Sequence, residues 1–485
     1  MIIFPPLSIG GGSQTPVQFP AQGGGLLMLT EAIEYYHSLF NDDVARENDA
    51  ALSAALQREG LFFGTRPICI VLRPRLLGAE HYAQLQEVCG RVASAARQVV
   101  KFMLSDPLTR DLMAFTAGEE ALLALPAGYA EPSATSRLDS FFDNQTGSLQ
   151  FVEYNAESPA GMAYEDGLSD VFLSLPVMQE FGRKYRVTKV PTAPSTVQTL
   201  LEKFREWGKS DDPRAAIVDW KGLPTQAEFV MFKKYLEEQG VPAVICSPDE
   251  LSYRDRTLYA DGQPVNLVYK RVLTSEFLQR YGHDQALVHP LGRAYRDGSI
   301  CLVNSFQAKP LHKKMIFGLL SDPAIMDSAG IDRETQLMLA QHIPWTRRVQ
   351  NVRTTYQTQE IDLLKFARDY QDRLLLKPND EYGGKGITIG WESSADEWDE
   401  ALQAALESPF VVQERVHIAY EDYPQCVEGK LHIARRLVDT DPYLFGTRVQ
   451  GCLTRLSTVT LLNVTAGGGS TVPTFLIEPR ESAAS

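Results

Sequence analysis

The fold is best read from the stretch Arg137-Leu-Asp139-Ser-Phe-Phe-Asp-Asn-Gln-Thr-Gly-Ser-Leu-Gln-Phe-Val-Glu153-Tyr-Asn155. Polar and apolar residues alternate on both sides of Asn144-Gln-Thr-Gly147, a typical turn sequence, so the stretch predicts a β-hairpin. Side chains two apart on a strand share a face, which places Arg137 beside Asp139 and Glu153 beside Asn155. Pairing across the turn then gathers a cation, two carboxylates and an amide into one patch.

The polar residues of this hairpin predict a metal site. Asp139, Glu153 and Asn155 all offer hard oxygen atoms, and Mg2+ at a nucleotide phosphate prefers one or two carboxylates together with phosphate oxygens. A second interpretation is that the alternation only marks the solvated face of a hairpin. The hairpin alone does not separate these interpretations, and the second half of the chain favours the metal site.

A glycine-rich loop follows in Leu374-Leu-Leu-Lys377-Pro-Asn-Asp-Glu-Tyr-Gly383-Gly384-Lys385-Gly386-Ile-Thr-Ile, which is typical of two strands joined by a loop. The three glycines let backbone N-H groups approach an anion closely, and the two lysines supply positive charge. No helix follows the loop directly, so it is neither a P-loop nor a Rossmann fingerprint. A plain glycine turn between two strands is the alternative interpretation.

A helix over 395–408 and an apolar strand over 410–416 are predicted next along the chain. This second strand ends in Gln413 and Glu414, and such a strand end offers a carboxylate and backbone amides. We expect it to hold an adenine and its ribose.

The order strand, lysine, glycine loop, strand, helix and Gln-Glu strand end resembles the nucleotide-binding half of the ATP-grasp superfamily. In ordinary ATP-grasp enzymes the Glu-x-Asn metal ligands come after this half, whereas Glu153-Tyr-Asn155 comes before it. The order is therefore similar to that of the circularly permuted ATP-grasp proteins related to glutathionylspermidine synthetase. The resemblance extends from about Arg137 to Arg455, and we expect the synthetase part alone, without the amidase domain of the bifunctional relatives.

The resemblance implies a role for several residues around the nucleotide. Mg2+ would be held by Asp139, Glu153 and Asn155, with Arg137 near the reacting phosphoryl group. Lys314 and Lys377 match the lysines that hold ATP phosphates, and Arg455 matches a late arginine that steadies the transferred phosphate. The implied ATP site thus comprises Lys314, Lys377, Gly383, Gly384, Lys385, Gly386, Gln413 and Glu414. Because Lys313 precedes Lys314, the sequence leaves open which of the two lysines matches the first phosphate lysine of the family. The sequence of the glycine loop also differs from that of the synthetase.

Three further residues are candidates for the substrate site. Glu157 and Ser158 directly follow the metal ligands and are expected to shape the acceptor site, although Ser158-Pro-Ala-Gly161 is equally a turn that leads into a helix. Arg271 ends an apolar strand, and such strand ends border ligand crevices in α/β folds. Arg271 either binds a carboxylate of the substrate or forms an ion pair with an acidic residue nearby.

Along the chain, the patterns predict an α/β (α+β) protein of four regions. Residues 1–135 form a mostly helical region with a mobile glycine-rich start over 9–25, and residues 136–185 form the hairpin and a helix. Residues 195–305 form a Rossmann-like platform without a dinucleotide fingerprint, and residues 306–480 bind the nucleotide. Helices are predicted over 30–56, 79–103, 164–181 and 225–239, and strands over 68–72, 215–219, 243–246 and 265–269.

Composition is that of an ordinary globular chain, with 44% hydrophobic and 22% charged residues among 485. The formal charge of -14 argues against a nucleic-acid partner. No apolar run is long enough to span a bilayer, and the start lacks the features of a signal peptide. Six scattered cysteines are typical of reduced core residues, so we expect a cytoplasmic protein without a membrane partner. The oligomeric state stays open.

The resemblance implies an ATP-dependent carboxylate-amine ligase. Such an enzyme forms a peptide-like amide bond through an acyl phosphate and releases ADP and phosphate, so its partners are a small-molecule acid and amine and its cofactors are ATP and Mg2+. Two other hypotheses are an ATP-grasp phosphotransferase and a nucleotide-binding protein without turnover. The combination of a metal triad with Lys377 and Arg455 argues against the last, because a pure binder needs no metal triad.

Overall fold

Strand β21 (Lys430–Phe445) organises the central sheet of the computed structural model, which describes residues 23–458 and 469–480. β22 pairs along one edge of β21, while β20 and β4 share the other edge. The order is β23-β22-β21-β4-β5, with β20 beside the first half of β21. The other strands of this sheet are β4 (Thr135–Phe142), β5 (Leu149–Asn155), β20 (Tyr420–Val427), β22 (Arg448–Ser457) and β23 (Ser470–Val472).

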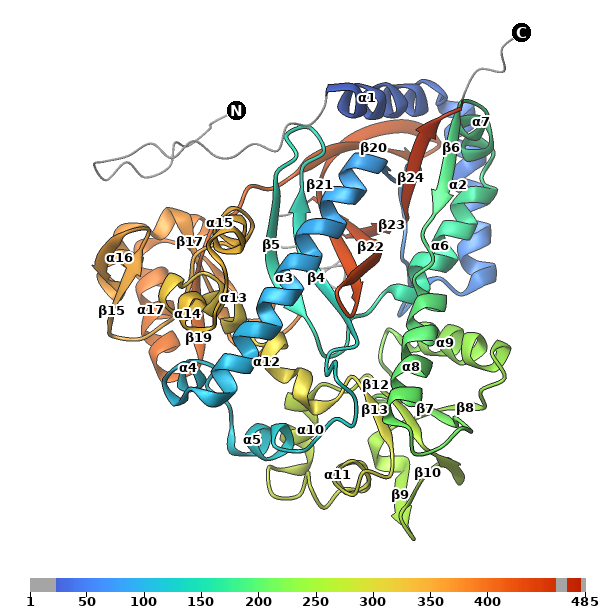
Figure 1. Ribbon diagram of the computed structural model, residues 1–485. Helices are drawn as coiled ribbons and strands as arrows, with labels where there is room; N and C mark the ends of the chain where they lie inside the picture. The colour runs from blue at the N-terminus through green and yellow to red at the C-terminus, as the bar shows by residue number, and fades with distance from the viewer. Residues whose placement is uncertain (1–22, 459–468, 481–485) are drawn as a thin grey trace.

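The predicted hairpin is confirmed as β4 and β5. Its antiparallel register pairs Arg137 with Asn155 and Asp139 with Glu153. Every residue of β4 is buried, so the interpretation of this strand as a solvated hairpin is wrong. The long helix α3 (Ala79–Ser105) lies across one face of the central sheet (Figure 1), which the predicted helix over 79–103 matches.

A second sheet carries the glycine loop. Its order is β14-β19-β17-β18, and β17 pairs antiparallel with both neighbours. Gly383, Gly384 and Gly386 all adopt positive φ between β17 and β18, a conformation that other residues rarely adopt. The predicted strand over 410–416 ends two residues early. The elements are β14 (Thr346–Arg348), β17 (Leu374–Pro378), β18 (Thr388–Ile389), α17 (Ala395–Glu407) and β19 (Phe410–Glu414).

The predicted platform is confirmed as a parallel sheet of order β13-β12-β7-β8. The buried run of β7 has apolar residues throughout, as expected for a parallel strand covered on both faces. A small antiparallel meander, β9 to β11, is inserted after β8. The elements are α8 (Ala193–Trp207), β7 (Ala215–Val218), α9 (Gln226–Glu238), β8 (Ala243–Cys246), β9 (Leu251–Arg254), β10 (Thr257–Ala260), β11 (Gln263–Val265), β12 (Leu267–Lys270), α10 (Thr274–Tyr281), α11 (Pro290–Arg296) and β13 (Cys301–Val303).

Two predicted helices are each divided into two in the structure. The helix over 30–56 is two helices, α1 (Gly23–Ser38) and α2 (Asp42–Glu59), because Asn41 caps the second one. The helix over 164–181 is likewise divided into α6 (Met162–Ser174) and α7 (Pro176–Lys184), since the residue before Pro176 is extended.

The run 68–72 is buried for the most part but forms no strand. The strand of this region is instead β3 (Arg75–Gly78), which pairs with β24 (Thr474–Pro479). On the other edge of β24 lies β6 (Tyr185–Lys189), and Figure 1 shows these two strands side by side. The expectation of a mobile start lies mostly outside the described residues, and residues 23–25 already belong to α1.

The remaining elements connect these sheets and cover their faces. They are β1 (Phe62–Phe63), β2 (Arg66–Pro67), α4 (Pro107–Leu112), α5 (Ala117–Leu123), α12 (Lys309–His312), α13 (Met315–Leu320), α14 (Pro323–Ser328), α15 (Arg333–His342), β15 (Arg353–Tyr356), β16 (Gln359–Asp362) and α16 (Leu363–Asp369). Among the described residues, no helix has both the length and the apolar character needed to cross a bilayer. All six cysteines are free, and five of them are buried.

Candidate active site

A cavity of about 580 Å³ lies where the hairpin, the glycine loop and the strand ends of the platform meet. Most residues that the sequence singles out line it, although they come from segments more than 300 positions apart. The lining includes Arg137, Asp139, Glu153, Asn155, Ser158, Arg271, Lys377, Gly383, Gly384, Gln413, Glu414 and Arg455. A cavity of this size is typical of a small-molecule site.

Asp139 lies at the centre of the polar part of this cavity. Its two carboxylate oxygens accept hydrogen bonds from Arg137, from Nε at 2.7 Å and from Nη2 at 2.9 Å. The side-chain amide of Asn155 and Nη2 of Arg455 also donate to it, at 2.9 and 2.8 Å. Burial alone would raise the pKa of Asp139, but the two guanidinium groups outweigh it and hold that pKa well below its usual range.

Arg455 gathers two more buried carboxylates. Its Nε donates to Asp439 at 2.7 Å, and its Nη2 lies 2.8 Å from a carboxylate oxygen of Asp441. Burial raises the pKa of both Asp439 and Asp441, against the attraction of Arg455. With Asp139 counted, three carboxylates face the guanidinium groups of Arg137 and Arg455, so the cluster holds more acidic groups than basic ones.

Glu153 faces the candidate phosphate lysines. Lys314 Nζ lies 3.1 Å from Glu153 Oε1, and Lys377 Nζ donates to the carbonyl of the preceding residue, Val152, at 3.0 Å. Burial would raise the pKa of Glu153, yet the lysines lower it below its usual value. Burial also lowers the pKa of Lys377 to about 8. Both lysines therefore adjoin the predicted metal ligand.

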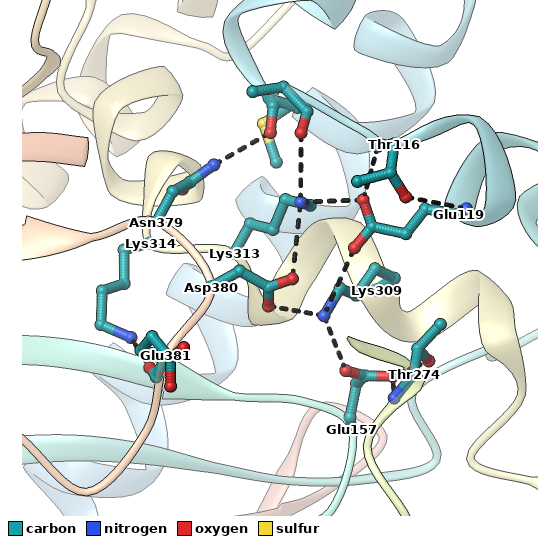
Figure 2. Close-up of polar contacts among 12 residues, drawn as sticks. Thr116, Glu119, Glu157, Thr274, Lys309, Lys313, Lys314, Asn379, Asp380 and Glu381 are labelled. Carbon is teal, nitrogen blue, oxygen red and sulfur yellow. Dashed lines mark hydrogen bonds and ion pairs between the residues drawn. The ribbon is translucent and has the colours of Figure 1, made fainter. Parts of the chain in front are cut away.

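The structure separates Lys313 from Lys314. Lys314 extends toward Glu153 and the carbonyl of Glu381, whereas Lys313 Nζ points to Glu119 at 3.0 Å and to Asp380 at 3.6 Å. Figure 2 shows these two directions on either side of the chain segment that begins the glycine loop. Of the two lysines, the geometry thus favours Lys314 as the candidate phosphate lysine, because its side chain is the one that contacts Glu153.

A buried ionic network anchors the base of the glycine loop. Lys309 Nζ contacts Asp380 at 2.5 Å, Glu157 at 3.2 Å and Glu119 at 3.6 Å (Figure 2). Glu119 belongs to α5, in the N-terminal region, where Thr116 and Glu119 form a capping box. Farther along the loop, Tyr382 donates to Glu276 of the platform at 2.9 Å. The loop is therefore held at its base by one region and near its tip by another.

Four predicted residues do not line the cavity. Lys314 is one of them, although it contacts Glu153, which does line the cavity. Lys385 is exposed and pairs with Glu381 at 3.4 Å, and Gly386 only turns the loop. Glu157 is fully buried behind the cavity, between Lys309 and Lys270, and these two lysines hold its pKa far below its usual range despite its burial. It therefore supports the cavity wall instead of shaping the acceptor site directly, whereas Ser158 lines the cavity.

The strand end at Gln413 and Glu414 forms another part of the cavity wall. Gln413 donates to Thr346 at 3.0 Å, and Glu414 accepts from Tyr356 at 2.8 Å, while burial raises the pKa of Glu414. The surrounding lining is largely apolar, and it includes Leu375, Ile387, Ile389, Trp391, Val416 and Ile418. An apolar slot beside a polar strand end suits a planar base.

Some lining residues carry no motif that sequence inspection would single out. Asp219 and Glu276 line the cavity from the platform, and Asp439 does so from β21. His312 also lines it; its ring is buried, and burial lowers its pKa. Two of these residues had a usable signal in the sequence. Asp219 directly follows a buried parallel strand, and His312 directly precedes Lys313 and Lys314.

The predicted donor set fits Mg2+ through the oxygens of Glu153 and Asn155. Within residues 23–458 and 469–480, no group of three or more His, Cys, Asp or Glu side chains has a metal-binding arrangement. The predicted set has two carboxylates and one amide, however, and Mg2+ often takes few protein ligands. Asn155 uses its N-H to bind Asp139, so its amide oxygen stays available, and Glu153 uses only one oxygen for Lys314. These oxygens fit the ion, whereas both oxygens of Asp139 already accept guanidinium hydrogen bonds.

Comparison with known proteins agrees with this geometry. A sequence model of the family described as circularly permuted ATP-grasp type 2 matches residues 140–457, more than half of the chain. The chain belongs to the circularly permuted ATP-grasp type 2 family, and the predicted family and fold are confirmed. Arg137 and Asp139 lie just before the matched range.

Two individual proteins are also similar. A protein from Frankia alni, named as a candidate glutamate-cysteine ligase 2-3, is 24% identical over 249 residues, which make up 50% of this chain and 26% of that protein. The chain thus matches about a quarter of the length of this relative. A solved structure of a glutathione synthetase-like effector from Globodera pallida has a TM-score of 0.55 at 12% identity, covering 90% of this chain and 98% of that one. This likeness concerns the fold.

Proposed function

We propose that the protein is an ATP-dependent carboxylate-amine ligase acting on small molecules. The observation that carries the proposal is that Lys377, Glu153 and Asp139 line a cavity bordered by a glycine loop. Lys314 contacts Glu153 from behind this lining. Membership of the ATP-grasp family supports the use of ATP, and the name of the Frankia alni relative supports formation of a carbon-nitrogen bond.

The proposed reaction has two steps. A carboxylate oxygen of the first substrate attacks the terminal phosphorus of ATP, the bond from that phosphorus to the bridging oxygen breaks, and ADP leaves. An amine nitrogen of the second substrate then attacks the acyl carbon, the carbon-oxygen bond to phosphate breaks, and the nitrogen loses a proton. The products are an amide, ADP and inorganic phosphate, and neither step needs a nucleophile from the protein.

The chain's own residues would act mainly by position and charge. Lys314 and Lys377 would bind phosphate oxygens, and Arg137 and Arg455 would stabilise the charge on the transferred phosphoryl group. Glu153 and Asn155, with Asp139 beside them, would hold Mg2+. The ion would neutralise phosphate charge when bound. The glycine loop, with its positive φ glycines, would cover the phosphates with backbone N-H groups.

The strand end at Gln413 and Glu414 would receive the adenine and ribose. This assignment follows from the apolar lining around Trp391 and from the polar strand end next to it. We propose that Lys385 contributes only through its charge at the loop surface, because its side chain is exposed.

Hydroxylamine trapping tests the reaction class. Purified protein with Mg-ATP and pools of carboxylic acids should form a hydroxamate when hydroxylamine is present, because the reagent intercepts an acyl phosphate. ADP release should then depend on both the acid and an amine. Formation of a stable phosphorylated product, with ADP release independent of any amine, would indicate a phosphotransferase instead. ATP binding without any turnover in all pools would contradict an enzymatic role.

A further inference from the structure

Two opposite charges lie side by side at the platform end of the cavity. Strands β7 and β12 are parallel neighbours whose last paired residues are Val218 and Lys270, and the backbone N-H of Arg271 donates to the carbonyl of Val218 at 2.9 Å. Asp219 and Arg271 each directly follow one of these paired residues, so they lie next to each other at the carboxyl ends of the two strands. Both line the cavity, and the carboxyl ends of parallel strands are where α/β sheets bind ligands.

Neither charge is fully satisfied by the protein. The carboxylate of Asp219 accepts one hydrogen bond, from the backbone N-H of Trp220 at 2.8 Å, and no described residue forms an ion pair with it within 4 Å. The Nε of Arg271 is buried without a hydrogen-bond partner among the described residues. Its nearest carboxylate is Glu228 at 3.7 Å, and its Nη1 donates to Tyr269 at 3.0 Å and to the carbonyl of Pro159.

The pKa of Asp219 also indicates that its carboxylate lacks a close cationic partner. Burial raises its pKa to about 6, although Arg271 opposes that shift. A carboxylate that loses water on burial and forms no ion pair within 4 Å with any described residue is stabilised when a ligand brings a cation into contact with it. An ammonium group is the natural partner, while Arg271 offers the planar donor fork that suits a carboxylate.

We propose that this end of the cavity binds the zwitterionic α-amino-acid head of one substrate, with its carboxylate at Arg271 and its ammonium group at Asp219. The inference rests on the proposed function and deepens it. A head group held through both charges does not react. The carboxylate or amine that enters the new bond is therefore on the side chain of that substrate, so the product is a side-chain amide.

The proposed head-group end of the cavity lies next to the Arg137 and Asp139 cluster. Arg271 donates to the carbonyl of Pro159, and Arg137 donates to the next carbonyl, that of Ala160, at 3.0 Å. Consecutive residues are separated by about 3.8 Å along the chain. The head-group end thus adjoins the Arg137 and Asp139 cluster, within the reach of an amino-acid side chain.

Calorimetry on nucleotide-free protein tests the proposal. Each standard L-amino acid is titrated, and every binder is compared with its N-acetyl and its carboxamide derivative. We expect at least one free amino acid to bind, and each derivative to bind about 10-fold or more weakly, since each loses one charged contact. Asp219→Asn should bind the free and N-acetylated forms equally, and Arg271→Gln, which lacks the positive charge, should bind the free carboxylate and the carboxamide equally. Asp284→Asn, an exposed change in the same region, is the matched control.

Three outcomes would overturn the inference: equal binding of the free and N-acetylated forms by the unchanged protein, wild-type selectivity in Asp219→Asn, or no binding of any amino acid by a protein that binds Mg-ATP. Asp219→Asn preserves shape, and a thermal melt confirms that each variant is folded. Titration with Mg-ATP is run separately. Amino-acid binding without any ATP binding would contradict the proposed function and leave this head-group site standing.

Discussion

Arg455 and Asp139 form an ion pair of 2.8 Å although they are 316 residues apart in the chain. Strand β21 makes this contact possible, because β4 carries Asp139 along one edge of β21 and β22 carries Arg455 along the other. Asp139 thereby joins the early arginine of the hairpin, Arg137, to the late arginine. Asp139 therefore brings together in space two arginines that the permuted order of the chain places far apart in the sequence.

Removal of Arg455 should destabilise the protein in a manner that depends on pH. Arg455→Ala leaves Asp439 and Asp441 buried without their guanidinium, which costs about 3 to 5 kcal/mol for a broken buried pair. Their pKa values are already raised in the folded protein and would rise further. A carboxyl whose pKa is higher in the folded state than in the unfolded chain favours folding at low pH and loses that contribution as pH rises.

Urea unfolding at about pH 8 and about pH 5.5 measures this effect. The loss of stability relative to the unchanged protein should be larger at the higher pH. Arg448→Ala, an exposed change at the start of the same strand, should show little loss at either pH. An equal loss at both values would mean that the two aspartates do not titrate in response to Arg455.

ATP affinity should fall as pH rises through about 8, the lowered pKa of Lys377. Above this pH the amine loses its proton and its attraction for phosphate, while a phosphate group with its second pKa near 6 keeps its charge. Lys377→Arg stays protonated, so its affinity should change much less over the same range. Lys377→Met should bind ATP more weakly, by about 1 to 3 kcal/mol.

Calorimetry in two buffers of different ionisation enthalpy gives an independent measure, because the unchanged protein should take up a proton when ATP binds near pH 8. Lys365→Arg, at an exposed lysine of α16, should behave like the unchanged protein. A flat affinity in the unchanged protein would exclude Lys377 as a phosphate ligand.

Lys314 and Lys313 should differ in what their loss affects. Lys314→Met removes the ammonium beside Glu153 and should weaken ATP binding by about 1 to 3 kcal/mol. Lys313→Met instead leaves Glu119 and Asp380 with one cation fewer, so it should mainly lower the melting temperature. Thermal melts and calorimetry on both variants make the comparison. The reverse assignment would follow if Lys313→Met reduced affinity more than Lys314→Met.

Local patterns predicted the parts of the fold that depend on nearby residues. The hairpin was predictable because the alternation and the Asn144 to Gly147 turn lie within one short stretch, and its register then followed from strand geometry. The glycine loop was predictable for the same reason. The run 68–72 is buried without being a strand, because burial gives an apolar pattern and pairing depends on a distant partner.

The candidate site was predictable only where a motif marked it. Glu119 supports the glycine loop from α5, and Asp439 lies beside Arg455 through sheet pairing. Neither residue belongs to a local sequence pattern that would connect it to the cavity. The choice between Lys313 and Lys314 likewise required knowledge of which side chain faces Glu153. For Arg271, the predicted acidic neighbour is present as Glu228. The binding of a substrate carboxylate stays a prediction for this residue, which lines the cavity.

Glu153→Gln should separate metal binding from nucleotide binding. The substitution keeps the shape of the side chain but removes the charge that would hold Mg2+ and that faces Lys314. We expect turnover to fall by roughly 100-fold or more, the scale found when one electrostatic stabiliser of a transition state is lost. The Mg2+ concentration for half-maximal activity should rise about 10-fold or more, while affinity for metal-free ATP should fall little, because Lys314 and Lys377 remain. Glu478→Gln, at an exposed position of β24, is the control. Steady-state assays across Mg2+ concentrations provide the measurement, and an unchanged Mg2+ requirement would show that the ion is held by other groups, such as Asp439.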